Sequence, residues 1–137
     1  MGAHISLPAY TRSISERYQL TCWKCKECGT YHFPPPTLCT NCSAREFEQV
    51  VPSGRGKIYS FTWIAAGGAP GEYAEQVKLN GSYGVALVDL EEGVRVMGQL
   101  TDCDLEEVKI GQEVQMVFRV LYSLEGVIRY GFKFKPV

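Results

Sequence analysis

The sequence predicts a mainly β protein in which an N-terminal metal-binding ribbon precedes a small five-stranded barrel. Three observations support this fold class. Two CxxC pairs lie close together between residues 25 and 42, five later segments alternate between apolar and polar residues, and short turn sequences separate several of those segments. Paired CxxC motifs are typical of metal ribbons, and a period of two is typical of strands with one buried face.

Length and charge limit the classes of protein that the chain can represent. The 137 residues are 45% hydrophobic and 21% charged, which fits one or two small domains around a modest core. The net charge of −1 gives no general attraction to nucleic acid or anionic lipid. No run approaches the ~20 apolar residues of a membrane span, and MGAHISLPAY lacks the regions of a signal peptide. We therefore expect a cytoplasmic protein with no membrane partner.

The N-terminal third divides into an arm and a cysteine-rich ribbon. We expect residues 1–21 to form a short helical or extended arm and residues 22–50 to form the ribbon. In a reducing cytosol, clustered CxxC pairs favour metal binding over disulfides. The first pair can be formed by Cys22 and Cys25 or by Cys25 and Cys28. Gly29 favours the second pairing, because the residue after a metal-binding knuckle often needs a positive φ angle, which glycine adopts without steric cost.

We therefore predict a closed site with one structural zinc ion per chain, held by Cys25, Cys28, Cys39 and Cys42. Such a site leaves no open position for substrate, so it contributes to folding and not to chemistry. Two alternatives remain: iron in a rubredoxin-like electron carrier, and a redox-active CxxC. The spacing alone does not distinguish zinc from iron, whereas an iron protein would be red.

Three other residues, near the ribbon or in the barrel, are of types that can react or bind metal. Cys22 and Cys103 are interpreted as small buried thiols, because neither belongs to a motif of nucleophile and base. His32 lies between the knuckles, but four cysteines already satisfy the metal, so we expect a surface or packing role. Pro34, Pro35 and Pro36 follow it and favour a stiff, extended loop.

Residues 51–137 are expected to form the barrel. Strands are predicted in five segments: 57–65, 82–90, 94–102, 113–122 and 127–136. The sequences EEG and SLEG close two hairpins, and 104–112 contains a short helical turn. Five strands of this length favour an OB-fold barrel, which is the commonest closed or nearly closed form of that size.

Two details of the barrel bear on function. The alternation places Tyr59, Phe61 and Trp63 on one face of the first barrel strand. Residues 65–82 are expected to be the longest irregular connection, with Tyr73 and Tyr83 as anchors if it binds a partner.

The order of three motifs resembles the acyl-CoA-associated family that joins a rubredoxin-like zinc ribbon to an OB-fold. The motifs are CKECG with a following FPP, then GRGKIYSFTW, then TDCDLEEVKIG. The resemblance runs from about Arg17 to the C-terminus. SERYQL, at residues 15–20, is further similar to members that accompany thiolases, such as the archaeal acetoacetyl-CoA thiolase and hydroxymethylglutaryl-CoA synthase assembly and benzoylsuccinyl-CoA thiolase.

The resemblance implies a non-catalytic accessory subunit in a hetero-oligomer with a thiolase-superfamily catalytic subunit. That complex would form or thiolytically cleave C–C bonds in acyl-CoA thioesters, with the CoA thioester bound by or with the partner. Only the four zinc cysteines carry over from the family's functional residues. The chain departs from the usual pattern at Pro36, Thr40 and Ser43, where the family often has a basic residue, proline and glycine.

Two further hypotheses concern the barrel surface. Arg129, Lys133 and Lys135 alternate along the last strand and are candidate contacts for CoA phosphates. The alternative function is a single-stranded nucleic-acid-binding protein, in which bases stack on Tyr59, Phe61 and Trp63 beside that basic face. The balanced net charge makes nucleic acid the less favoured partner. We predict no catalytic residue, since no nucleophile with a base, paired carboxylates or phosphate loop is recognisable.

Overall fold

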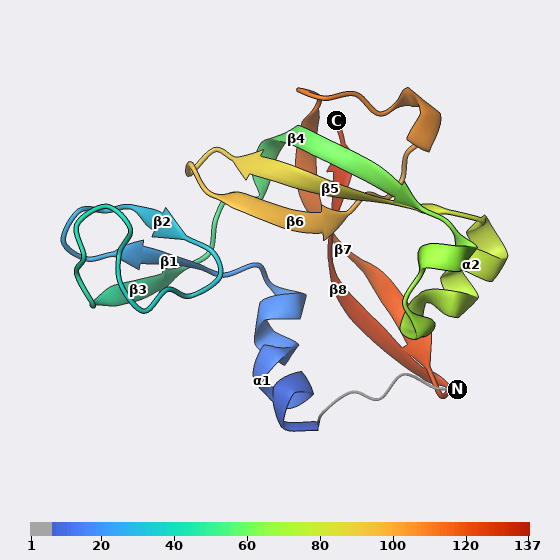
Figure 1. Ribbon diagram of the computed structural model, residues 1–137, viewed down its shortest axis with the longest axis horizontal. Helices are drawn as coiled ribbons and strands as arrows, with labels where there is room; N and C mark the ends of the chain where they lie inside the picture. The colour runs from blue at the N-terminus through green and yellow to red at the C-terminus, as the bar shows by residue number, and fades with distance from the viewer. Residues whose placement is uncertain (1–6) are drawn as a thin grey trace.

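The computed structural model describes residues 7–137, which form two antiparallel sheets and a small number of helices (Figure 1). The described part of the arm contains α1 (Leu7–Tyr18), so of the two forms expected for the arm, helical or extended, these residues adopt the helical one; residues 1–6 lie outside the described part of the chain. No helix in the described residues is long and apolar enough to span a bilayer.

The ribbon is a three-stranded sheet with the order β2-β1-β3. Its strands are β1 (Cys22–Cys25), β2 (Tyr31–His32) and β3 (Phe47–Val50). The central strand pairs Trp23 with both His32 and Gln49. Strands this short are marginal without additional packing, so the loops that carry the cysteines need a further stabilising interaction.

The barrel is a five-stranded antiparallel sheet with the order β6-β5-β4-β7-β8. Its strands are β4 (Arg55–Ile64), β5 (Tyr83–Leu90), β6 (Arg95–Gln99), β7 (Glu113–Leu124) and β8 (Val127–Pro136). A parallel bridge between Leu100 and Phe134 joins the two ends of the sheet, and the Thr101 N–H donates to the Phe134 carbonyl at 2.9 Å. The barrel is therefore nearly closed, which confirms the predicted fold class.

One continuous core fills the barrel and reaches the ribbon. Phe134 and Val88 are completely buried, and Ile58, Ala86 and Val96 are almost so. Leu20 and Cys22, which lead into and begin the ribbon, belong to the same buried cluster as these barrel residues. The ribbon and the barrel thus share packing at this seam, and the boundary that we predict at residues 21 and 22 lies within it.

The predicted alternation along β4 is wrong at Tyr59, because a β-bulge shifts the pairing with β5 between Ile58 and Ser60. In a regular strand, Ile58 and Phe61 would face opposite sides, because they are three positions apart. Here Ile58 is buried and Phe61 also packs against the core, since the bulge adds one residue between them. Tyr59 is exposed, and Arg95 lies over its ring, 3.4 Å from the ring centroid. The three aromatic residues therefore do not form one continuous stacking face.

The connection between β4 and β5 is ordered, so the expectation of an irregular segment is also wrong. It contains the 3-10 turns η1 (Ala66–Gly68) and η2 (Gly71–Tyr73) and the helix α2 (Ala74–Asn80). Tyr73 anchors it: its ring centroid lies 5.4 Å from that of Tyr83 and 5.2 Å from that of Tyr122. A third turn, η3 (Leu105–Glu107), lies between β6 and β7 and matches the predicted helical turn.

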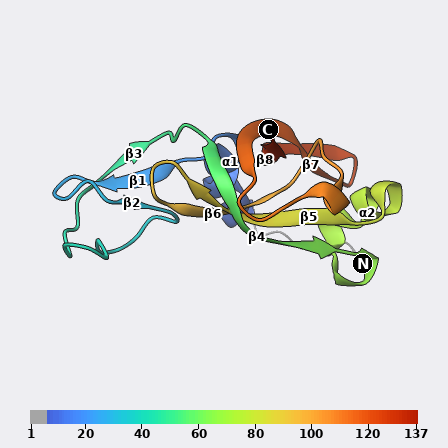
Figure 2. The same ribbon diagram turned by 90° about the horizontal axis from the view of Figure 1, so that it is seen from above.

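The ribbon and α2 lie at opposite ends of the molecule. Figures 1 and 2 show β1, β2 and β3 beyond one side of the barrel and α2 beyond the other. The hairpin of β7 and β8 extends past the barrel below α2 in Figure 1. Candidate sites on the ribbon and near α2 are consequently separated by the whole barrel.

Candidate metal centre

Two loops of the ribbon bring the four predicted cysteine sulfurs together. The Sγ atoms of Cys25, Cys28, Cys39 and Cys42 all lie within 4.8 Å of one another. Cys25 Sγ is 3.6 Å from Cys42 Sγ, and Cys28 Sγ is 3.5 Å from Cys39 Sγ. Sulfurs bound at 2.3 Å to a tetrahedral zinc ion would lie about 3.8 Å apart. The spacing of the cysteine cluster therefore fits a zinc ion, and it is far too long for disulfides.

The two knuckles have the same backbone geometry. The Gly29 N–H donates to the Cys25 carbonyl at 2.9 Å, and the Ser43 N–H donates to the Cys39 carbonyl at 2.9 Å. Gly29 has φ = +75° and Ser43 has φ = +61°. Glycine reaches this left-handed region at no steric cost, whereas serine does not. The second knuckle is therefore the more strained one, as expected from serine at the position where the family often has glycine.

Electrostatics within the cluster also favour a bound cation. Hydrogen bonds from the Thr30 side chain, then from the Asn41 side chain and the Thr30 N–H, lower the pKa of Cys28 to about 5. A backbone hydrogen bond from Ala44 favours the Cys42 thiolate, but burial and the other three sulfurs oppose it and raise the pKa of Cys42 to about 12. Neighbouring thiolates repel one another, so the four sulfurs ionise together only around a positive ion.

Cys22 lies outside the cluster and is completely buried in the core that the ribbon shares with the barrel. Burial, followed by the nearby charge of Glu92, raises the pKa of Cys22 to about 11. Its thiol is therefore protonated at neutral pH and acts as a small apolar side chain. This placement agrees with the interpretation of Cys22 as the surplus cysteine.

We expect Cys22→Ser to keep one zinc per chain and to lose stability. The serine hydroxyl would be buried in an apolar core, which costs about 1–3 kcal/mol if it finds no partner. Metal analysis of the purified variant, together with urea unfolding, checks both parts. A variant that has lost its zinc would instead place Cys22 among the ligands.

His32 is a residue whose role the sequence did not reveal. It is 8% exposed, it packs edge-to-face on Phe47 with ring centroids 5.5 Å apart, and its Nε2 lies 3.4 Å from Cys39 Sγ. With the proton on Nε2, the imidazole donates a hydrogen bond to the Cys39 sulfur. Such a donor orients a metal ligand and partly offsets its negative charge. This is the one cysteine–histidine contact recorded within residues 7–137, and its cysteine belongs to the metal cluster.

Replacing His32 by Phe is expected to lower zinc affinity by about 10–100-fold, because the donor to Cys39 is lost while the ring packing is kept. Competition with a chromogenic chelator measures this change directly. His32→Gln, which keeps an N–H donor, is the matched control and should lie closer to the wild type. Equal affinity for His32→Phe and the wild type would contradict a role at the metal.

The three basic residues of β8 do not form one exposed surface. Lys135 is exposed, Arg129 is partly buried and Lys133 is only 6% exposed. Lys133 instead lines two cavities beside α2. Contact of these residues with CoA phosphates stays a prediction, and only Lys135 is fully available at the surface for it.

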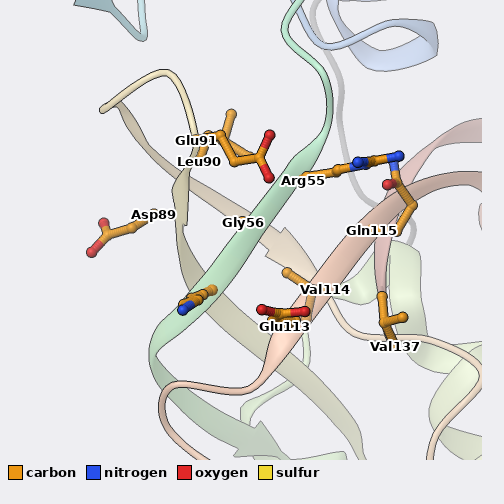
Figure 3. A pocket seen from close by; sticks show the side chains of 10 residues that line it. Arg55, Gly56, Asp89, Leu90, Glu91, Glu113, Val114, Gln115 and Val137 are labelled. Atoms are coloured by element: carbon orange, nitrogen blue, oxygen red, sulfur yellow. The ribbon is translucent and has the colours of Figure 1, made fainter.

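A different cavity, of about 670 Å³, lies between β4, β5 and β7 (Figure 3). Arg55 and Gln115 lie together at one rim in Figure 3, and Asp89, Glu91 and Glu113 point from other sides. Asp89 is already paired with Arg95 at 2.6 Å. The lining carries charges of both signs, and every fully buried polar side-chain atom in it has a hydrogen-bond partner. These features do not indicate a particular ligand.

Comparison with protein families matches both parts of the chain. Residues 17–48 match the rubredoxin-like zinc ribbon domain of ChsH2, and residues 49–119 match the C-terminal OB-fold domain of ChsH2. The chain belongs to the ChsH2/DUF35 family. The zinc-ribbon match and the cysteine cluster together support a structural zinc ion in this member of the family.

Relatives in the ChsH2/DUF35 family cover nearly the whole chain. A DUF35 domain-containing scaffold protein of Methanocaldococcus jannaschii is 42% identical over 92% of this chain and 87% of its own. The benzoylsuccinyl-CoA thiolase subunit BbsA of Geobacter metallireducens is 36% identical over 81% of this chain and 71% of its own. A solved structure described as an Ltp2-ChsH2(DUF35) aldolase has a TM-score of 0.67 and 26% identity, and covers 98% of both chains. These relatives are described as scaffold proteins or as parts of enzyme complexes.

Proposed function

We propose that the chain is a zinc-containing accessory subunit that docks to a thiolase-superfamily catalytic subunit acting on acyl-CoA thioesters. The observation that supports this most directly is the 36% identity to a thiolase subunit, together with the 98% mutual coverage of a DUF35 chain described with an aldolase. In this proposal the catalytic residues and the CoA-binding site belong mainly to the partner. The OB-fold and the ribbon would supply the surfaces that bind the catalytic subunit and would support its structure.

The proposed metal ligands are Cys25, Cys28, Cys39 and Cys42. With four protein ligands, a tetrahedral zinc ion has no position left for water or substrate. It would supply folding free energy to a ribbon whose strands have two to four residues. Through the core shared at Leu20 and Cys22, the same ion would also help to hold the ribbon against the barrel.

Nucleic-acid binding has less support in the described residues. Phe61 packs against the core, Arg95 covers Tyr59, and Lys133 is buried. A stacking protein needs exposed aromatic faces within a positive field. We therefore retain the accessory-subunit proposal alone.

Co-expression tests the proposal. The full chain, carrying a tag, is produced together with a thiolase-superfamily subunit from the same organism and purified by size exclusion. The expected result is a stable complex with thiolase or synthase activity, and no activity of the tagged chain alone. Turnover by the isolated chain, or failure of the two chains to associate at micromolar concentration, would overturn it.

A further inference from the structure

Two neighbouring cavities beside α2 share part of their lining. A polar cavity of about 690 Å³ and an apolar cavity of about 390 Å³ share Gln76, Asn80 and Lys133 in their linings. The polar part includes Ser82, Thr101 and the acidic residues Asp102, Asp104 and Glu106; the apolar part includes Leu79, Val120, Leu121 and Ile128. We call this combined surface the α2 groove. Helix α2, which supplies part of its lining, lies at the end of the molecule opposite the ribbon (Figures 1 and 2).

Lys133 is the most unusual residue of the α2 groove. The residue is only 6% exposed, and its side chain makes no hydrogen bond or ion pair with any described residue. Burial lowers the pKa of its ammonium group, and the charge of Asp102 opposes this change. Its Nζ is not among the fully buried polar atoms that lack a partner, so it faces the open part of the groove, where a ligand can bring the acceptor that the protein does not supply.

Gln76 lacks a hydrogen-bond donor, whereas Lys133 lacks an acceptor. Its Oε1 is buried and has no donor among the described residues, and the residue lines both parts of the groove together with Lys133. The groove therefore lacks one acceptor, at Lys133, and one donor, at Gln76. The backbone of a short peptide supplies both kinds of group, since each non-proline residue has a carbonyl oxygen that accepts and an N–H that donates.

The charges of the groove argue against an anionic ligand. Asp102 is neutralised by Arg119, with an oxygen–nitrogen distance of 2.6 Å. Asp104 and Glu106 have no cation within the described residues, although Asp104 also accepts from the Glu106 N–H at 3.0 Å. The rim is thus negative around the ammonium group of Lys133, so a carboxylate or phosphate would be repelled and a cationic side chain attracted.

The apolar part of the groove indicates that the ligand also carries an apolar group. Leu79 is 83% exposed, Ile128 is 52% exposed and Val120 is 46% exposed. These side chains offer a surface for an apolar side chain next to the polar cavity. A peptide that carries a basic residue near an apolar one has the required amide, charge and apolar group in one short segment.

We propose that the α2 groove binds an extended peptide segment of the catalytic subunit, with a backbone carbonyl accepting from Lys133 Nζ and a backbone N–H donating to Gln76 Oε1. An apolar side chain of that segment packs on Leu79, Val120 and Ile128, and a basic one reaches Asp104 and Glu106. This inference rests on the proposed function for the existence of the partner and adds the surface and the chemistry by which it is recognised.

The first test is Lys133→Met measured in the complex. Loss of a hydrogen bond from a charged group is expected to raise the Kd for the catalytic subunit by about tenfold to a hundredfold. The isolated variant should keep or increase its melting temperature, because a largely shielded ammonium group with no acceptor in the protein has been removed. Lys109→Met is the matched control and should leave both quantities unchanged, since Lys109 is exposed and lines neither cavity.

The second test identifies the segment. A photo-crosslinking benzoylphenylalanine in place of Leu79 should label a segment of the catalytic subunit in which a basic residue is close to an apolar one. Labelling of an acidic segment, or of a second copy of this chain, would overturn the assignment. So would saturable binding of pantetheine to the isolated chain that Lys133→Met abolishes, because the amide would then come from a small molecule.

The two proposals fail in different ways. If the wild-type chain forms no complex, the accessory-subunit function is wrong. If the complex forms and Lys133→Met binds as tightly as Lys109→Met, the function stands and the α2 groove is not the docking surface.

Discussion

Replacing Cys39 by Ser is expected to remove the zinc ion and unfold the ribbon together. Cys39 is 2% exposed, its sulfur lies 3.5 Å from that of Cys28, and its N–H and carbonyl hold the second knuckle through Ala44 and Ser43. Structural zinc binding contributes about 10–16 kcal/mol in small zinc-dependent folds, and a hydroxyl is a poor substitute for a thiolate. That contribution is comparable to the whole stability of a typical domain.

Metal content by plasma mass spectrometry and circular dichroism of the same sample measure the Cys39→Ser result. The wild type should carry one zinc per chain, and the variant should carry none and lose its cooperative transition in the ribbon. Cys103→Ser is the control, since Cys103 is a partly buried cysteine outside the cluster. A folded Cys39→Ser variant with a full equivalent of zinc would show that the ligand assignment is wrong.

Phe134→Ala is the second change with a large expected effect. Phe134 is completely buried, its ring contacts that of Phe132 with centroids 5.9 Å apart, and a Cβ added at Gly98 would lie 2.8 Å from its ring. The ring thus occupies the space that glycine leaves at the point where β6 approaches β8. Removing a buried phenylalanine ring costs about 3–5 kcal/mol, because both its transfer free energy and a cavity are involved.

Urea unfolding at 25 °C measures the Phe134→Ala change as a lower midpoint at a similar slope. Ile110→Ala, at a position that is 70% exposed, should change the free energy of unfolding by no more than about 0.5 kcal/mol. Equal midpoints for the two variants would mean that the junction of β6 and β8 adds little to the stability of the barrel.

The sequence predicted the parts of the fold that depend on local chemistry. The CxxC spacing and Gly29 identify the four sulfurs that the structure brings together, because glycine fits the positive φ at the end of the first knuckle. The five strands follow from alternation and from turns such as Glu91–Gly93, where the Gly93 N–H donates to the Leu90 carbonyl at 2.9 Å. These signals act over a few residues and are visible in one sequence.

The features that the sequence did not reveal depend on partners distant along the chain. The bulge after Ile58 is set by the pairing of β4 with β5, and helix α2 is too short for a helical period to stand out between glycine and proline. The burial of Lys133 results from the packing of β8 beside α2, and the contact of His32 with Cys39 from the return of the ribbon loop. No local pattern encodes these contacts.

The seam at Leu20 and Cys22 restrains the ribbon relative to the barrel. These two completely buried side chains pack in the core of the barrel, so the ribbon is not connected to the barrel by a flexible linker alone. The ribbon and α2 lie at opposite ends of the barrel (Figure 2). The packing at the seam therefore limits how far the ribbon end can move relative to the α2 end.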